Sequence, residues 1–523
     1  MMSTGSAVRP VPNLSVGEMT YTPESPTAVS VAAASKAESW EGDLLVLLAF
    51  QQEDKEAFAV LAGGEAEAAD KRFDGAAVDM ISTQEFKGEK KGSVSSMLGS
   101  KTGVKRIAVL GLGKKDKEGA ALTSAELEAV GTQLAALAKL SKCKSMAVVL
   151  PEGGCAEGST QALAQGALIG LYADKRYKSE EEAKKAPPLE SIEIIGGEES
   201  ASLDAAKAVA SGVSLCRDLV NSPSNVLTPG ALADAAAKVA ADHGLECEIL
   251  EEDEIKARGM GAYMGVAQGA VFPPKFIHLT YKSSDTPKKK VALIGKGLTF
   301  DSGGYNIKAG AGSMIELMKF DMGGSACTLG AAKAIGQLKP EGVEAHFIVA
   351  ACENMVSERA MRPGDILTAS NGKTIEVINT DAEGRLTLAD ALVFAEKLEV
   401  DAIIDSATLT GACLIALGTD YAGMWSSDED LAKELTDVGA ETGEKLWRMP
   451  LAAEYGDQVK SKIADLKNVG ARPGSSITAA LFLKEFVEKT PWAHLDIAGP
   501  VWKEEATGYG VRLLTRWVQK QGK

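Results

Sequence analysis

Short runs of apolar residues recur along the chain, separated by stretches with helical periodicity. In the first part of the chain, four such runs predict buried strands, at 44–48, 106–110, 146–150 and 192–195. Between the second and third runs, residues 124–140 have the pattern of a helix, with Ser124 placed to cap it. Strands that alternate with helices are typical of an α/β domain.

The later part of the chain repeats this alternation. Strands are predicted at 291–294, 345–350 and 401–404, with helices at 326–337 and 386–398. An amphipathic stretch from 202 to 220 predicts a long linking helix. We therefore predict two domains: a smaller N-terminal α/β domain over 41–205 and a larger C-terminal α/β domain over 206–523. The second should hold a central, mostly parallel sheet sandwiched by helices, with its binding site at the C-terminal ends of the strands.

The first forty residues are rich in Ala, Ser, Thr, Val and Pro and poor in charge. They lack the long apolar core of a secretory signal, so we expect either a disordered tail or the remnant of an organellar transit peptide over 1–40. No apolar run approaches the ~20 residues that span a bilayer, so we expect a soluble protein that does not use a membrane.

The charge, cysteine and histidine content of the chain excludes several classes of partner and metal site. The net charge of −16 over 523 residues would repel nucleic-acid phosphates and anionic lipid, so neither is an expected partner. The seven cysteines include no C-x-x-C pair, which argues against a zinc ribbon and a thioredoxin-type redox site. Cysteines scattered along a chain this long indicate a reducing compartment. The four histidines, His243, His278, His346 and His494, are far apart in sequence. A His-rich zinc site is therefore not expected, and any metal should be held mostly by oxygen.

Three glycine-rich segments carry the candidate chemistry: GKGLTFDSGG at 295–304, followed by Lys308; MKFDMGG at 318–324; and NTDAEGR at 379–385. Taken singly, their acidic residues would be turn or cap residues. Taken together, four carboxylates that meet in a fold interior would raise one another's pKa unless cations lie among them. Two divalent metal ions would balance them, as in a two-metal hydrolase. Zinc, manganese, magnesium and cobalt all suit oxygen ligands with one amine.

The segment NTDAEGR resembles the signature of the leucyl (cytosol) aminopeptidase family of dinuclear-metal peptidases. The other two segments are similar to that family's metal-binding stretches at the right spacing. The sequences DSGGYNIK, IELMKFDMGGSA and HFIVAACENM are most similar to those of plant and algal members. The resemblance covers about residues 205 to 523. It implies that 206–523 form a metallopeptidase catalytic domain that releases N-terminal residues from peptides.

The resemblance implies a role for each motif residue. Five residues would ligate two divalent ions per subunit, Mn or Zn with Mg or Co as alternatives: Lys296, Asp301, Asp321, Asp381 and Glu383. Asp301 and Glu383 would bridge the ions. Lys308 and Arg385 would be the catalytic residues that bind no metal. Lys308 would stabilise the oxyanion, and Arg385 would hold a bicarbonate ion that shuttles the proton.

The resemblance also implies a set of substrate-binding residues: Met318, Asn379, Thr408, Leu409, Gly411 and Ala498, with Val501 beside them. Leu409 would act through its backbone carbonyl. Several of these residues are apolar, which favours Leu or Met as the first residue of the substrate. Ordinary core packing is the alternative for Met318 and Ala498.

A homohexamer of two stacked trimers is implied too, acting on peptides with a free N-terminus. Its compartment would be the cytoplasm, or the plastid stroma if the first forty residues derive from a transit peptide. Two other functions stay open: a non-catalytic chaperone or scaffold role, and a specialised dipeptidase such as one for Cys-Gly. Metal removal would separate hydrolysis from scaffolding, and kinetics would separate the two peptidases.

Overall fold

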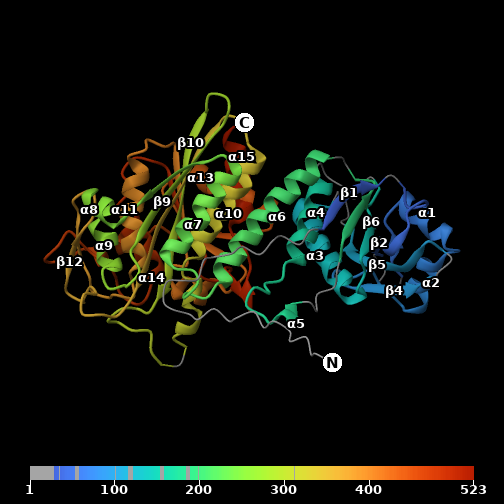
Figure 1. Ribbon diagram of the computed structural model, residues 1–523, viewed down its shortest axis with the longest axis horizontal. Helices are drawn as coiled ribbons and strands as arrows, with labels where there is room; N and C mark the ends of the chain where they lie inside the picture. The colour runs from blue at the N-terminus through green and yellow to red at the C-terminus, as the bar shows by residue number, and fades with distance from the viewer. Residues whose placement is uncertain are drawn as a thin grey trace, which may run out of the picture.

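The computed structural model describes residues 29–34, 36–52, 58–99, 102–115, 122–152, 158–183, 189–197, 200–310 and 312–523. The tail or transit peptide expected over 1–40 therefore lies mostly outside the described residues. Two lobes, each built on its own sheet, make up the molecule, with the long helix α6 (Ser200–Asn221) running between them (Figure 1). The domain boundary predicted at residue 205 falls inside this helix.

The N-terminal sheet has seven strands in the order β1-β7-β6-β2-β5-β4, with β3 beside β2. The strands are β1 (Ser30–Ala34), β2 (Gly42–Gln51), β3 (Val60–Leu61), β4 (Ser93–Met97), β5 (Val104–Lys114), β6 (Ser145–Val149) and β7 (Ser191–Ile195). The helices around it are α1 (Gly64–Arg72), α2 (Ala76–Thr83), α3 (Ser124–Ser141), α4 (Ser159–Leu171) and α5 (Glu180–Ala183). Leu44 and Leu45 of β2 enter apolar clusters on opposite faces, which is why the strand is continuously apolar.

Two details of this lobe differ from the sequence prediction. β1 lies within the first forty residues and pairs in parallel with β7, so this stretch is strand rather than tail. Its Ser-Val-Ala-Ala-Ala sequence carries little strand signal, and the pairing with β7 decides its structure. α3 is capped by Thr123 rather than Ser124, because Thr123 and Glu126 exchange the two hydrogen bonds of a capping box.

The C-terminal sheet has eight strands in the order β16-β15-β18-β14-β10-β11-β9-β8. These are β8 (Glu246–Leu250), β9 (Lys275–Lys282), β10 (Lys289–Asp301), β11 (Val343–Asn354), β14 (Ala402–Ala407), β15 (Ala422–Ser426), β16 (Leu446–Arg448) and β18 (Trp492–Asp496). Its centre, β18-β14-β10-β11, is parallel, whereas β9 and β15 pair with it in antiparallel fashion. The carboxyl ends of the four central strands therefore meet at one edge.

Helices cover both faces of this sheet, as predicted. On one face, with α6, lie α7 (Pro229–His243), α10 (Gly323–Leu338), α13 (Glu429–Thr442) and α15 (Val511–Gln521). On the other lie α8 (Glu252–Ala257), α9 (Gly261–Ala267), α11 (Gly384–Glu396), α12 (Gly411–Leu417) and α14 (Ser475–Lys484). Leu293 and Ile294 of β10 face the two opposite layers.

Short elements complete this lobe: η1 (Ile315–Phe320), η2 (Ala453–Val459), β12 (Ile366–Thr368), β13 (Thr374–Glu376), β17 (Leu466–Lys467), β19 (Trp502–Lys503) and β20 (Glu505–Ala506). The predicted fold class, an α/β protein of two domains with a mostly parallel central sheet between helices, is confirmed. Among the described helices, none combines the length and apolarity needed to cross a membrane.

Candidate functional site

Four strand ends define the site at the carboxyl edge of the C-terminal sheet. Asp301 ends β10 and Asn354 ends β11. Thr408 directly follows β14, and Asp496 ends β18. Because these strands are parallel neighbours, polar residues far apart in sequence are brought to one edge of the sheet, as the sequence predicted.

Two helix starts bring the remaining carboxylates. Asp321 ends the turn of η1 just before α10, and Glu383 directly precedes α11. Glycines permit the close approach: a Cβ on Gly324 would lie 2.0 Å from the Ser406 carbonyl oxygen, and one on Gly384 would lie 2.3 Å from Cε of Lys296. Any side chain at Gly324 would push α10 away from the sheet.

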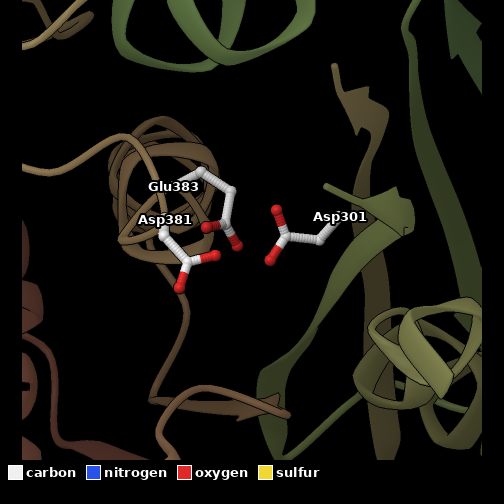
Figure 2. A group of neighbouring side chains, drawn as sticks. All are labelled: Asp301, Asp381 and Glu383. Carbon is white, nitrogen blue, oxygen red and sulfur yellow. The ribbon is translucent and has the colours of Figure 1, made fainter. Parts of the chain in front are cut away.

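Asp301, Asp381 and Glu383 form a carboxylate cluster. Each offers one oxygen, and these oxygens all lie within 4.8 Å of one another. Figure 2 shows the three carboxyl groups turned toward a common centre, Asp301 from β10 and the other two from the start of α11. The side chains of Asp301 and Glu383 are buried, but that of Asp381 is 32% exposed. The cluster therefore opens to solvent on the Asp381 side.

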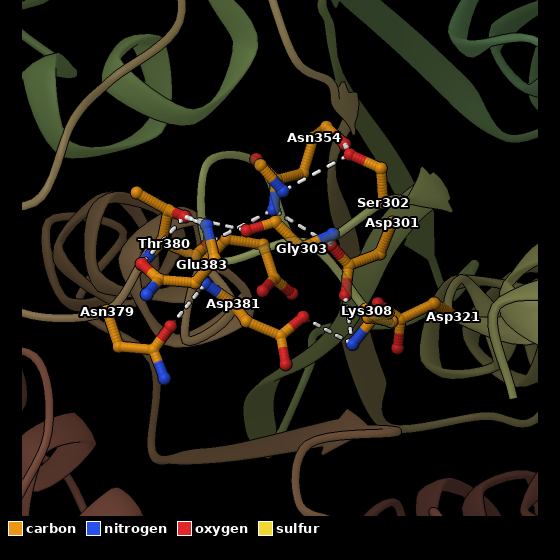
Figure 3. A network of polar contacts seen from close by, with 12 residues as sticks. Asp301, Ser302, Gly303, Lys308, Asp321, Asn354, Asn379, Thr380, Asp381 and Glu383 are labelled. Atoms are coloured by element: carbon orange, nitrogen blue, oxygen red, sulfur yellow. Dashed lines mark hydrogen bonds and ion pairs between the residues drawn. The ribbon is translucent and has the colours of Figure 1, made fainter. Parts of the chain in front are cut away.

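Two lysines lie among the acidic groups. Nζ of Lys308 is 2.8 Å from Oδ2 of Asp301 and 2.5 Å from Oδ1 of Asp381 (Figure 3). Nζ of Lys296 lies 2.8 Å from Oδ2 of Asp321 and 3.0 Å from Oε1 of Glu383. Six of the seven residues that the motifs singled out therefore form two ion-paired groups, which meet where Glu383 lies beside Asp301 and Asp381; we call these six residues the charged network, and Arg385 is not part of it.

Burial and charge act against each other in this network. Burial is the largest effect on both lysines and disfavours their charge, but the surrounding carboxylates hold their pKa values above the ordinary range. Burial and neighbouring carboxylates raise the pKa of Asp301, and burial raises that of Asp321 to about 6. Burial works to raise the pKa of Glu383 too, yet Lys296 and Lys308 keep it low. Four carboxyl groups thus share two ammonium groups.

The network fits divalent cations. Oε2 of Glu383 is buried and has no hydrogen-bond partner among the residues that the structure describes. An unpartnered carboxylate oxygen in a buried site is costly unless a cation meets it. The cluster of hard oxygen donors around it, with excess negative charge, is the donor set that divalent metal ions prefer.

Arg385 lies in the first turn of α11, buried beside the cluster. Its Nη1 donates to the carbonyl of Asn468 over 2.8 Å, and its buried Nε has no partner within the described part of the chain. Burial lowers the pKa of Arg385 to about 10, which still leaves the guanidinium charged at neutral pH. It therefore retains a free donor that suits a small anion.

The predicted substrate residues divide into groups. Oγ1 of Thr408 donates to Asp321 over 2.8 Å, and the Thr408 carbonyl accepts from Lys296. The backbone amides of Leu409 and Ala498 both donate to Oδ1 of Asp496, each over 3.2 Å. Thr408 therefore contacts the charged residues Asp321 and Lys296, whereas Leu409 and Ala498 both contact Asp496.

The other predicted substrate residues have different surroundings. Gly411 starts α12 with open space around its α-carbon. Met318 and Val501 belong to one buried apolar cluster. The side chain of Asn379 accepts from the amide of Asp381 over 2.9 Å, so it positions a cluster carboxylate.

Sequence reasoning missed several supporting residues. Nδ2 of Asn354 donates to Asp301 and to the carbonyl of Thr380 (Figure 3), and its place at the end of an apolar run was the available signal. Asp496 ends β18, a strand that the sequence analysis did not predict. The Asn468 side chain hydrogen-bonds the backbone of Ile378, just before the NTDAEGR segment, and of Asn379 and Ala382 within it, but no motif surrounds Asn468.

Comparison with known proteins agrees with this geometry. A family model described as the cytosol aminopeptidase family, catalytic domain, matches residues 214–515, and that family's N-terminal domain matches 46–181. A probable cytosol aminopeptidase of Cyanothece is 52% identical over 495 residues, covering 92% of this chain and 98% of the relative. One of Nostoc punctiforme is 52% identical over 490 residues, covering 92% and 97%.

Among solved structures, a mutant of tomato leucine aminopeptidase superimposes with a TM-score of 0.86 at 42% identity, covering 96% of this chain and 99% of that one. The match therefore extends across both lobes rather than the catalytic motifs alone. With both family domains present in order, the chain belongs to the cytosol aminopeptidase family and is a metal-dependent aminopeptidase, a metallo-exopeptidase hydrolase.

Proposed function

We propose that this enzyme removes N-terminal residues, Leu and Met preferred, with two divalent ions held by the carboxylate cluster. The ligands would be Lys296, Asp301, Asp321, Asp381 and Glu383, and the ions would be Mn or Zn, with Mg or Co as alternatives. The observation that carries the proposal is the unpartnered, buried Oε2 of Glu383 within this cluster. When bound, the ions would activate a water molecule and polarise the scissile carbonyl.

Lys308 is the proposed electrophile. Its ammonium group lies on the solvent-open side of the cluster, between Asp301 and Asp381. Burial disfavours its charge, but the surrounding carboxylates raise its pKa and keep it charged, so it carries a fixed positive charge for an oxyanion that develops in the substrate. Two lysines with different partners support different roles, since Lys296 lies deeper and contacts Asp321 and Glu383 instead.

Arg385 is the proposed holder of a bicarbonate ion that moves the proton. A guanidinium binds a planar anion through two parallel N–H groups. Nη1 of Arg385 is already engaged by the Asn468 carbonyl, which fixes the side chain, while its buried Nε lacks a protein partner among the described residues. That donor would face the bicarbonate.

The substrate's N-terminal residue would bind between the strand ends. Asp321 would accept from its free α-amine, which makes the enzyme an exopeptidase, and the Leu409 carbonyl would orient the peptide. Thr408 and Val501 would shape the side-chain pocket: a Cβ on Gly323 would lie 2.5 Å from Cγ2 of Val501 and 3.4 Å from Cγ2 of Thr408. Met318, Asn379, Gly411 and Ala498 complete the proposed substrate site.

The family resemblance supports two further proposals. The chain would assemble as a homohexamer of two trimers, and light scattering on the purified protein that gave a monomer mass would contradict it. It would act in the cytoplasm or the plastid stroma, which microscopy of a fluorescent fusion to the full chain would distinguish.

The first experiment is hydrolysis of a leucine amide chromogen with added Mn²⁺, with and without chelator. Metal-dependent cleavage by the wild type that is lost in Asp381→Ala supports the proposal. A folded, metal-loaded wild type that cleaves neither this chromogen nor N-terminally free dipeptides would overturn it in favour of a scaffold role. Cleavage restricted to Cys-Gly would identify a specialised dipeptidase instead.

A further inference from the structure

Two histidines that are 68 residues apart in sequence meet on the C-terminal sheet. His278 lies on β9 and His346 on β11, and Nε2 of His278 is 3.0 Å from Nδ1 of His346. The antiparallel register places Thr280 directly opposite His346, and strand alternation puts all three side chains on one face. Their distance in sequence therefore does not show how close the two rings are, because sheet pairing decides their separation.

Each ring turns its other nitrogen toward a carboxylate. Nε2 of His346 lies 3.1 Å from Oε1 of Glu344, and Nδ1 of His278 lies 3.5 Å from Oε2 of Glu248. A carboxylate behind the remote nitrogen fixes the tautomer in which the near nitrogen is a lone pair, and this is the usual support of a metal-binding imidazole.

The hydrogen atoms available around the two rings do not satisfy all of their nitrogen lone pairs. When both outer nitrogens donate to carboxylates, two lone pairs face each other across 3.0 Å. The Thr280 hydroxyl lies 3.2 and 3.3 Å from these two nitrogens, but it has a single hydrogen. If one ring adopts the other neutral tautomer, its lone pair faces Glu248 or Glu344 instead. Among the groups that the structure describes around the pair, either arrangement leaves one acceptor unsatisfied.

The three inner atoms have the spacing of metal ligands. Their separations of 3.0, 3.2 and 3.3 Å compare with the roughly 3.0–3.4 Å between donors that lie about 2.1 Å from one ion at octahedral or tetrahedral angles. The other cation that fits between the two rings is a proton shared by Nε2 of His278 and Nδ1 of His346.

The surroundings are compatible with a dication. Three carboxylates of the sheet edge, Glu246, Glu248 and Glu344, face this region. Each lies near a cation: Glu246 pairs with Lys282, Glu248 pairs with Arg258, and Glu344 lies 3.9 Å from Lys290. His278 also borders a surface cavity of about 460 Å³ that it shares with Glu248 and Phe394, which gives an ion and its water molecules access.

We propose that His278, His346 and Thr280 form a second metal site that takes one divalent transition-metal ion of the Zn²⁺ class, with water completing its coordination. The site is separate from the carboxylate cluster, because His346 lies near the start of β11 and Asn354 at its far end. The ion would tie β9 to β11. The proposal goes beyond aminopeptidase activity and does not depend on it.

Zinc stoichiometry tests the site. After equilibrium dialysis against Zn²⁺, His278→Gln and His346→Gln should each hold one zinc per chain fewer than the wild type. His243→Gln, which removes an imidazole from the end of α7, should hold as many as the wild type. Unchanged leucine amide hydrolysis in all three would show that they fold. Equal zinc content in all four proteins, which a shared proton would produce, overturns the proposal.

A second measurement can overturn the proposal with the wild type alone. The carboxylate cluster contains no imidazole, so electron spin-echo spectra of Cu²⁺ bound to the wild type should show imidazole nitrogen modulation only from the proposed site. The modulation should persist in His243→Gln and disappear in His278→Gln. Bound copper without imidazole modulation in the wild type would overturn the proposal.

Discussion

Asn354 and Asp301 end neighbouring parallel strands, and Nδ2 of Asn354 donates to Oδ1 of Asp301 over 2.8 Å. The same amide group donates to the carbonyl of Thr380 over 3.0 Å, next to Asp381. One side chain thus holds the carboxylate from β10 in register with the segment that precedes α11. Hydrogen bonds of this kind orient a ligand before the metal arrives.

We expect Asn354→Ala to weaken metal binding more than it weakens catalysis at saturating metal. Loss of a group that orients a ligand typically lowers metal affinity about 10–100-fold. The Mn²⁺ concentration that gives half-maximal leucine amide hydrolysis should rise by about that factor. Asn371→Ala, in the exposed turn between β12 and β13, is the matched control. An unchanged Mn²⁺ requirement in Asn354→Ala would show that the Asp301 contact has no such role.

Lys308→Met should separate catalysis from metal binding. Removal of one group that stabilises an oxyanion costs about 10²–10³-fold in kcat. The metal content should not fall, because the substitution removes a positive charge beside Asp301 and Asp381. Kinetics with elemental analysis on the same sample measure both quantities. Lys433→Met, which breaks only a surface pair with Asp437, controls for loss of a lysine. Loss of metal with activity would mean that Lys308 holds the site together.

Arg385→Met tests the bicarbonate proposal. In buffer depleted of carbon dioxide, added bicarbonate should accelerate the wild type, since loss of a positioned proton carrier costs about 10²–10⁴-fold. Arg385→Met should be slow and should not respond to bicarbonate. Arg359→Met, at an exposed position of the loop after β11, should respond like the wild type. A wild-type rate that is independent of bicarbonate would remove the anion from the proposal and leave Arg385 with its contact to Asn468.

The sequence predicts some strands and the residues of the carboxylate cluster, but it does not predict other strands or the residues that support the cluster. Apolar runs reveal β2 and β10 because both faces of each strand are buried, and Asp381 and Glu383 belong to a segment dense enough to recognise. By contrast, Asn468 acts through backbone groups 86 to 90 residues away. No local pattern encodes such a contact, and the same holds for β1, whose structure follows from pairing with β7.

The contact between His278 and His346 is a second one that no local sequence pattern predicts. Each histidine sits in an ordinary apolar strand pattern, and only the register of β9 against β11 brings the rings together. Sequence spacing is thus a sound guide to metal sites within one loop or helix. It fails where ligands come from paired strands, because the register is set by the whole sheet.

Glu353→Gln should stabilise the protein at alkaline pH. Burial raises the pKa of Glu353 from 4.5 to about 7. Between these values the folded state holds more protons than the unfolded state, so the free energy of unfolding falls as pH rises. The total loss is about 3 kcal/mol and is complete above pH 7. Glutamine has the shape of the protonated side chain but does not ionise, so the variant avoids this loss.

Denaturant unfolding of Glu353→Gln and wild type at equal chain concentration measures the difference. The two proteins should be similar near pH 5, and the variant should be more stable at pH 8 by up to about 3 kcal/mol. Glu358→Gln, an exposed position five residues along the same segment, should follow the wild type at both pH values. A difference between Glu353→Gln and wild type that is the same at pH 5 and pH 8 would show that the effect is one of packing. It would also mean that burial does not raise the pKa of Glu353 in the folded state.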